Sequence, residues 1–152
     1  MSYALFAHRK VELTGLLNCV QLQQTERSNE QFRLACNTLD HQQQLSSLQA
    51  SQSNELSELY KQLCDSTTED ERWNIQTEIK QLESTFDASV DTINREIYLI
   101  SVKENTVEMQ VKRLDTEVST LQKQLEAIEE AEEKLSQTES ELEEFVEENT
   151  ED

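Results

Sequence analysis

The near absence of glycine and proline constrains this chain more than any other feature. Its 152 residues contain no proline and one glycine, Gly15, where average usage would give roughly fifteen to twenty of the two together. Tight turns depend on the backbone angles that these two residues supply. The composition therefore argues against β-sandwiches, β-barrels and doubly wound α/β folds, and it favours long helices.

The second half of the chain carries a heptad pattern, the spacing that is typical of a coiled coil. Ten successive positions seven residues apart are apolar: Ile79, Phe86, Ile93, Ile100, Val107, Leu114, Leu121, Ile128, Leu135 and Leu142. If this row holds the d positions, a second and mostly apolar row holds the a positions, four residues after each d position from Phe86 on. Its members are Val90, Ile97, Glu104, Val111, Val118, Leu125, Glu132, Glu139 and Val146, with the three glutamates as charged exceptions. The two rows, called the seam below, predict a long helix that packs along a narrow stripe.

A polar cluster at residues 64–71 is the clearest break in the helical pattern. It contains three pairs in which a carboxylate follows a hydroxyl by three residues: Ser66 with Glu69, Thr67 with Asp70, and Thr68 with Glu71. Such pairs cap the start of a helix, because the hydroxyl accepts from a free N–H group and the carboxylate bonds back. The cluster predicts a hairpin turn. The alternative is a solvated acidic patch within one continuous helix.

The first half of the chain is also predicted to be helical, but its apolar pattern is irregular. Three separate stripes occur: Phe6, Leu13, Leu17 and Val20; then Phe32, Ala35, Cys36 and Leu39; then Leu45, Leu48, Leu56, Leu59 and Leu63. Polar residues 21–31 separate the first two stripes. A lone helix of this composition is weak and gains most of its order from packing, so the first helix is either continuous or interrupted near residues 21–31.

These patterns predict an all-α fold: a long antiparallel two-helix coiled-coil hairpin with an acidic, fraying C-terminal helix end. The expected segments are a first helix at 1–64, a turn at 65–68, a second helix at 69–147 and a disordered acidic end at 148–152. A reversal near residue 66 or 67 places Glu104 and its polar neighbours opposite residues 27–32. Glu104 would then fix the register through Arg27 or Arg33, as polar seam residues do in coiled coils.

The net charge of the chain argues against some classes of binding partner. The chain has 32 acidic and 13 basic residues, a formal net charge of −19 at pH 7, which argues against binding to nucleic acid or to anionic membranes. Residues 126–152 hold thirteen of the acids and one base, Lys134. This acidic segment is either a solvated helix end that keeps the protein soluble, or a DNA mimic or dock for a basic partner.

No pattern of catalytic, cofactor-binding or metal-binding residues is recognisable. The chain has two histidines, His8 and His41. Cys36 and His41 lie five residues apart, but no other Cys or His lies near them in sequence, and zinc needs more ligands. Glycine-rich nucleotide loops, HExxH and EF-hand patterns do not occur. A two-helix hairpin offers no enclosed pocket for a nucleophile. We therefore expect no catalytic residue, no cofactor and no metal, and a protein that is not an enzyme.

The sequence also bears on location. Cys19, Cys36 and Cys64 are odd in number and form no CxxC pair, which favours free thiols in a reducing compartment. The first 17 residues contain no apolar run of signal-peptide length, and no stretch approaches the roughly eighteen apolar residues of a membrane span. We expect this opening segment to dock on the second helix near residues 113–127 rather than to lie on a membrane. The expected location is cytoplasmic, although leaderless secretion would leave no mark in the sequence.

The predicted architecture favours a non-enzymatic structural or adaptor protein that acts through helix–helix contacts. One narrow seam gives an isolated hairpin marginal stability, so we expect protein partners along the seam or self-association. The alternative function is a subunit of a secreted or surface-associated helical assembly, of the bacterial export filament or translocator type. A basic partner that binds the acidic segment at residues 126–152 is also possible under this hypothesis.

Overall fold

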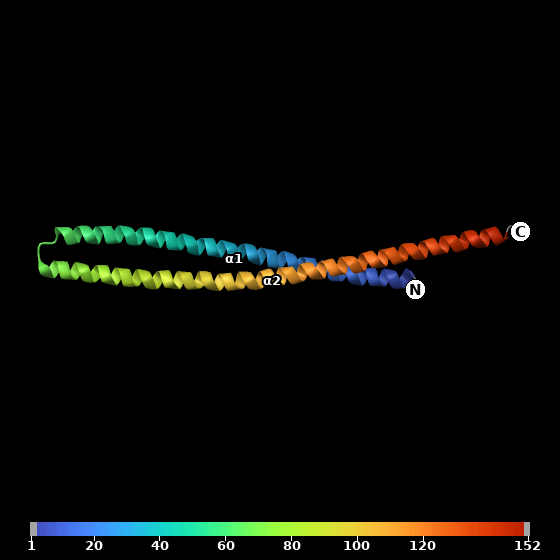
Figure 1. Ribbon diagram of the computed structural model, residues 1–152, viewed down its shortest axis with the longest axis horizontal. Helices are drawn as coiled ribbons and strands as arrows, with labels where there is room; N and C mark the ends of the chain where they lie inside the picture. The colour runs from blue at the N-terminus through green and yellow to red at the C-terminus, as the bar shows by residue number, and fades with distance from the viewer. Residues whose placement is uncertain (1–2, 151–152) are drawn as a thin grey trace. The chain divides into compact units, whose positions relative to one another are not determined.

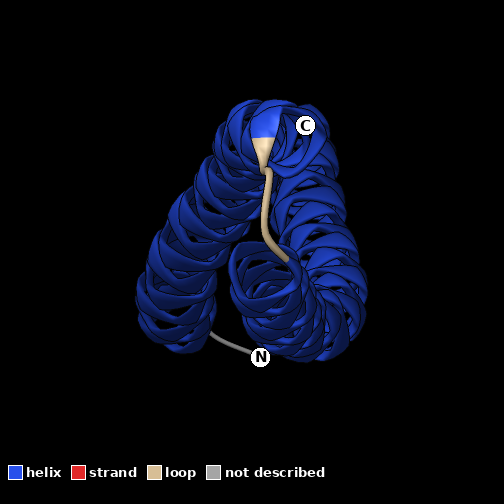
Figure 2. Cartoon of the chain, turned by 90° about the vertical axis from the view of Figure 1, so that its left-hand side faces the viewer, coloured by secondary structure: helices blue, strands red, loops and turns tan. Residues whose placement is uncertain are grey.

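The fold is an all-α helical hairpin, as the sequence predicts. The computed structural model describes residues 3–150, which form two helices, α1 (Tyr3–Asp65) and α2 (Glu69–Thr150), joined by residues 66–68 (Figure 1). Between residues 3 and 150 there is no β-strand. Figure 2 shows the short connection in tan between the two helices.

Helix α1 is continuous, and helix α2 is longer than predicted. The 63 residues of α1 run without a break through residues 21–31. That stretch is polar, but it contains no proline or glycine to end a helix. The 82 residues of α2 continue to Thr150, three residues past the predicted end. Residues 148–150 of the expected disordered end are therefore helical, and residues 151–152 lie outside the described part.

Two compact units divide the chain, and each contains a segment of both helices. The terminal unit comprises residues 1–29 and 108–152, and the turn unit comprises residues 30–107. In the terminal unit, Tyr3 contacts Glu139, whereas Gln24 contacts Asp115. Residue numbers therefore rise along α1 as they fall along α2, and the two segments of this unit are antiparallel.

The turn unit has the same arrangement. Thr38 contacts Glu104, and His41 contacts Glu96, so its helix segments are also antiparallel. The hydrophobic core of each unit consists of a few residues between the helices. Phe6 and Leu13 are buried in the terminal unit, and Leu34, Ile79, Ile100 and Val107 are buried in the turn unit. Most of each helix surface therefore remains exposed.

The link between the helices is closed by local hydrogen bonds. Ser66 is buried, and its Oγ donates to the carbonyl of Leu63 over 2.7 Å, which satisfies an orphan acceptor at the end of α1. Thr68 Oγ1 accepts from the Glu71 N–H over 3.3 Å at the start of α2. Among the three predicted capping pairs, Thr68 with Glu71 thus forms the helix N-cap, while Ser66 ends the preceding helix.

The predicted register between the helices is wrong. Glu104 accepts a hydrogen bond from Thr38, which lies six residues beyond the predicted stretch 27–32. The cause is the first turn of α2. Residues 67–74 are all exposed, and the half-buried residues that flank them are Leu63 and Ile75. The contacts of Thr38 with Glu104 and of His41 with Glu96 centre the pairing between residues 68 and 71 instead of at residue 66 or 67, which moves every opposite position along α1.

Candidate interaction site

The predicted seam of α2 faces α1 along most of its length. Of its d row, the buried members are Ile79, Ile100 and Val107, the half-buried members are Phe86, Ile93, Leu114, Leu121, Ile128 and Leu135, and the exposed member is Leu142. The a row is half-buried from Val90 to Glu132 and exposed at Glu139 and Val146. The seam is therefore covered by α1 as far as Leu135 and uncovered beyond it.

α1 carries a matching pair of heptad rows that the sequence analysis did not recognise. One buried or half-buried row consists of Phe6, Leu13, Val20, Arg27, Leu34, His41 and Leu48. The other consists of Lys10, Leu17, Gln24, Gln31, Thr38, Leu45, Gln52 and Leu59. Seven of these fifteen residues are polar, which hides the period. Stepping by seven from Phe6 would have found the first row, because five of its seven members are apolar.

The predicted second stripe of α1 is wrong. Phe32 is 71% exposed and Leu39 is 63% exposed, whereas the neighbouring Leu34 is buried. Ala35 is also exposed, and Cys36 alone in this stripe is half-buried. Apolar residues three and four positions apart show that a helix face is apolar, but they do not show which face packs. In α1, the face that packs is the one that carries the heptad row through Leu34.

Glu104 lies in a polar layer of the seam. Its side chain is half-buried, and its Oε1 accepts from Thr38 Oγ1 over 3.4 Å. Of the two arginines proposed as its partners, Arg27 is half-buried and Arg33 is exposed. An ion pair between Glu104 and either arginine stays a prediction. A half-buried carboxylate with one long hydrogen bond is poorly compensated for its lost hydration.

His41 forms the second polar contact of the turn unit. Its Nδ1 lies 2.7 Å from the Asn37 carbonyl oxygen, and its Nε2 lies 2.7 Å from Glu96 Oε2. Both partners are acceptors, so the doubly protonated ring satisfies both contacts. The bond to Asn37 raises the pKa of His41 above 6.5, Glu96 adds to the rise, and partial burial opposes it.

These contacts bear on the weak metal motif of Cys36 and His41. Both nitrogens of His41 already have partners within the protein. Over residues 3–150, no group of three or more His, Cys, Asp or Glu side chains is arranged to hold a metal ion. Cys19, Cys36 and Cys64 are free thiols.

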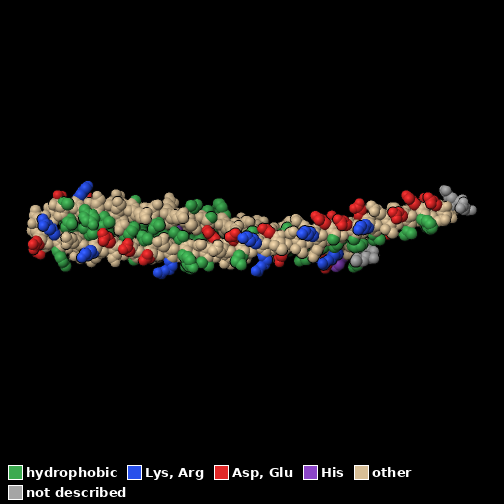
Figure 3. All heavy atoms as spheres, in the orientation of Figure 1, with side chains coloured by type: hydrophobic (Ala, Val, Ile, Leu, Met, Phe, Trp, Pro, Cys, Tyr) green, Lys and Arg blue, Asp and Glu red, His purple; other side chains and the backbone are tan. Residues whose placement is uncertain are grey.

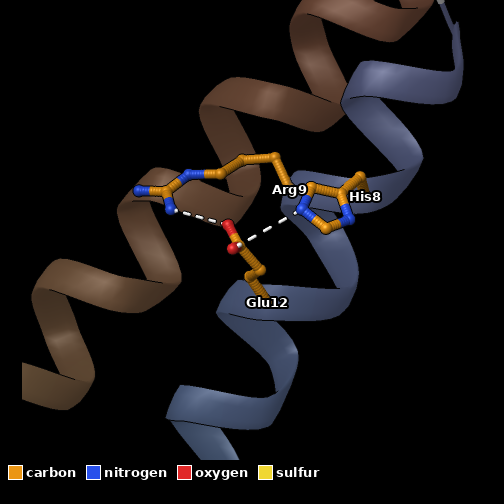
Figure 4. A network of polar contacts seen from close by, with 3 residues as sticks. All are labelled: His8, Arg9 and Glu12. Carbon is orange, nitrogen blue, oxygen red and sulfur yellow. Dashed lines mark hydrogen bonds and ion pairs between the residues drawn. The ribbon is translucent and has the colours of Figure 1, made fainter.

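Among the charged residues near the start of α1, some lie on the exposed face and one contacts the seam of α2. His8 and Arg9 both approach Glu12 on the same exposed face, at 3.6 and 3.1 Å (Figure 4). Lys10 instead reaches α2, where its Nζ donates to Glu132 Oε2 over 2.8 Å. That hydrogen bond raises the pKa of Lys10, and burial opposes the rise.

The contact of Lys10 explains why the seam tolerates Glu132, and it also shows where the opening segment docks. Glu132 occupies an a position, and Lys10 supplies the opposite charge that such a position needs. Glu139 similarly accepts from Tyr3 Oη over 3.1 Å. The opening segment thus docks on α2. Its end near Leu16 lies by Thr120 and Leu121, within the predicted residues 113–127. Lys10 and Tyr3, however, reach beyond that range to Glu132 and Glu139. The later centre of the hairpin accounts for this shift.

The C-terminal part of α2 is exposed throughout. Every residue from 136 to 150 is exposed, and Tyr3, where α1 begins, contacts Glu139. Residues 140–150, called the α2 overhang below, therefore continue beyond the described start of α1, and Figure 1 shows this red end extending past the N-terminal end. The overhang carries Leu142, Phe145 and Val146, which are 57%, 63% and 56% exposed.

Comparison with known protein families, curated proteins and solved structures gives no significant match. Neither helix, within residues 3–150, has the length and apolarity required to cross a membrane.

Proposed function

We propose that this protein is a non-enzymatic structural or adaptor protein that acts through helix–helix contacts and self-association. The observation that carries the proposal is the amount of large hydrophobic surface left outside the seam. In the turn unit, Phe32 and Leu39 project from α1, and Tyr98 projects from α2 with 66% of its surface exposed. In the terminal unit, Val11 and Met109 are similarly exposed.

Further helices are the natural cover for this surface. Phe32 and Leu39 are seven residues apart, so they lie on one face of α1 two turns apart. A helix packed beside them would bury both side chains without disturbing the seam. Burial of apolar area is the main driving force of association. This arrangement supports a protein whose exposed helix faces bind other helices, including those of a second copy.

Sedimentation velocity across roughly 1–200 μM protein tests the self-association. We expect a dimer or tetramer that dissociates on dilution. The double variant Phe32→Ala, Leu39→Ala should raise the dissociation constant by about tenfold, because it removes two exposed anchors that association would bury. Ser46→Ala, Ser53→Ala changes the same heptad position of α1 and serves as the matched control.

Three outcomes would decide the matter. Equal association of the parent, the Phe32 and Leu39 variant and the serine control would contradict the assigned faces. A monomer at every concentration, together with no partner captured from native lysate at low salt, would contradict the whole proposal. Association that continued into open-ended polymers would favour the alternative, a subunit of a secreted or surface-associated helical assembly.

A further inference from the structure

The α2 overhang repeats the seam pattern, and no described residue of α1 lies opposite it. Leu142 continues the d row whose preceding member, Leu135, is half-buried against α1, and Val146 continues the a row. Phe145 lies beside them on the same side of the helix, since residues three and four apart are neighbours on a helix surface. The packing surface of α2 therefore extends past the described start of α1 at Tyr3.

The charge of the overhang limits what can cover it. Its glutamates are Glu141, Glu143, Glu144, Glu147 and Glu148, and no lysine or arginine follows Lys134. Figure 3 shows hydrophobic and acidic side chains along opposite edges of this end of α2. Two copies of the overhang would bring ten carboxylates together, and like charges that meet at an interface oppose association. A helix that carries lysine or arginine would instead be attracted by the glutamates of the overhang.

We infer that the α2 overhang docks one amphipathic helix of another protein, with aliphatic side chains at heptad spacing and lysine or arginine beside them. This inference rests on the proposed function, because it names a second surface through which the protein contacts helices. The bound helix lies in line with α1 and occupies the same face of α2 that α1 covers up to Leu135. Eleven residues of helix span about 16 Å. The interface is therefore small, and its binding is rapid, reversible and sensitive to salt.

Three synthetic 18-residue peptides provide the probes. The first is an amphipathic helix with leucine at a and d and lysine at e and g. The second has the same composition in scrambled order, so that no leucine face forms, and the third replaces each lysine with glutamate. Fluorescence anisotropy with the full-length protein measures each affinity at roughly 50 and 300 mM salt, between which the Debye length falls from about 14 to about 6 Å.

We expect the basic amphipathic peptide to bind at least about tenfold more tightly than either other peptide. The variant Leu142→Ala, Val146→Ala should weaken it by about tenfold, since two aliphatic side chains lose their burial. Alanine preserves the helix, and both positions are exposed, so circular dichroism should be unchanged. Phe32→Ala, Leu39→Ala removes two apolar side chains elsewhere and should leave peptide affinity unchanged.

Two results would overturn the inference. Equal affinity for the basic and scrambled peptides, or an unchanged affinity of the Leu142 and Val146 variant, would mean that no seam contact forms there. Loss of self-association in that variant would instead identify a second copy as the occupant. Either failure is separable from failure of the proposed function, which the Phe32 and Leu39 variant tests at a different surface.

Discussion

At the scale of single residues, His41 occupies a seam position where a coiled coil ordinarily has an apolar side chain. Its contacts with the Asn37 carbonyl and Glu96 favour the protonated ring, so its pKa in the folded state lies above the ordinary 6.5. Protonated His41 therefore stabilises the fold. This contribution is complete below about pH 6.5 and disappears as the pH rises through the folded-state pKa.

We expect the stability difference between the parent and His41→Gln to shrink as the pH is raised from 6 to 8. Urea unfolding at several pH values measures this difference, and subtracting the variant removes the titration of the other groups. Glu96→Gln serves as the control, since it removes the charged partner and should reduce the pH dependence. A difference that stays constant with pH, or that grows toward pH 8, would contradict the assignment.

Glu104 is a residue whose removal should strengthen the hairpin. Its half-buried carboxylate has one long hydrogen bond, from Thr38. Glu104→Leu removes the cost of desolvating that carboxylate and adds apolar burial, so we expect a gain of about 1 kcal/mol in unfolding free energy. Exposed Glu108→Leu should stay within about 0.5 kcal/mol. A loss of stability in Glu104→Leu would show that the contact with Thr38 outweighs the desolvation.

At the scale of the helices, the two halves of the hairpin were not equally predictable. The unbroken apolar row of α2 could be read from Ile79 to Leu142, and the structure covers that row through Leu135. The rows of α1 place Arg27, His41 and Gln24 among their apolar members, so local stripes obscured the longer period. Polar seam residues are stable only because a particular partner faces them, and one helix read alone does not reveal that partner.

The turn was predictable in place but not in detail. Its capping residues lie within 64–71 in sequence, and the link occupies 66–68. The sequence did not reveal that the first turn of α2 remains exposed before Ile75. Register depends on where the two seams first meet, and that point is a property of the packed pair rather than of the turn residues.

Leu13 tests the seam of α1. It is 1% exposed, whereas Val11 on the same helix is 73% exposed. Leu13→Ala should lower the unfolding free energy by about 2–4 kcal/mol, because it removes buried methyl groups and leaves a cavity. Val11→Ala removes a side chain of similar chemistry from water and should change it by less than about 0.5 kcal/mol. Chemical denaturation compares the two, and equal effects would mean that α1 packs through another face.

Thr68 tests the start of α2. Its Oγ1 accepts the Glu71 N–H over 3.3 Å, a contact that caps the first turn of the helix. Thr68→Ala should cost about 1 kcal/mol of unfolding free energy. The neighbouring Thr67→Ala keeps the Thr68 hydroxyl and the backbone N–H of Thr67, so a much smaller loss is expected from the same denaturation experiment. A larger loss at Thr67 would move the N-cap one residue earlier.

At the scale of the whole molecule, the net negative charge is the feature that most affects how stability depends on salt. The chain carries a formal net charge of −19 at pH 7, and self-repulsion of this kind destabilises a folded state. Attractive contacts between the helices, such as Lys10 with Glu132 and His41 with Glu96, oppose it locally. Partly exposed pairs of this type contribute little to stability. Repulsion among the carboxylates should therefore affect stability more than the attraction within these ion pairs, and salt screens both.

We expect the melting temperature to rise by about 3 °C between roughly 10 and 150 mM sodium chloride, which corresponds to ~1 kcal/mol for a chain of this size. Over that range the Debye length falls from about 30 to about 8 Å, which screens repulsion between separated carboxylates while short ion pairs change less. Circular dichroism at 222 nm measures the transition. Glu147→Lys, Glu148→Lys lowers the net negative charge at two exposed positions of the α2 overhang and should reduce the dependence on salt. A melting temperature that fell with added salt would show instead that the ion pairs between the helices outweigh the repulsion of the whole chain.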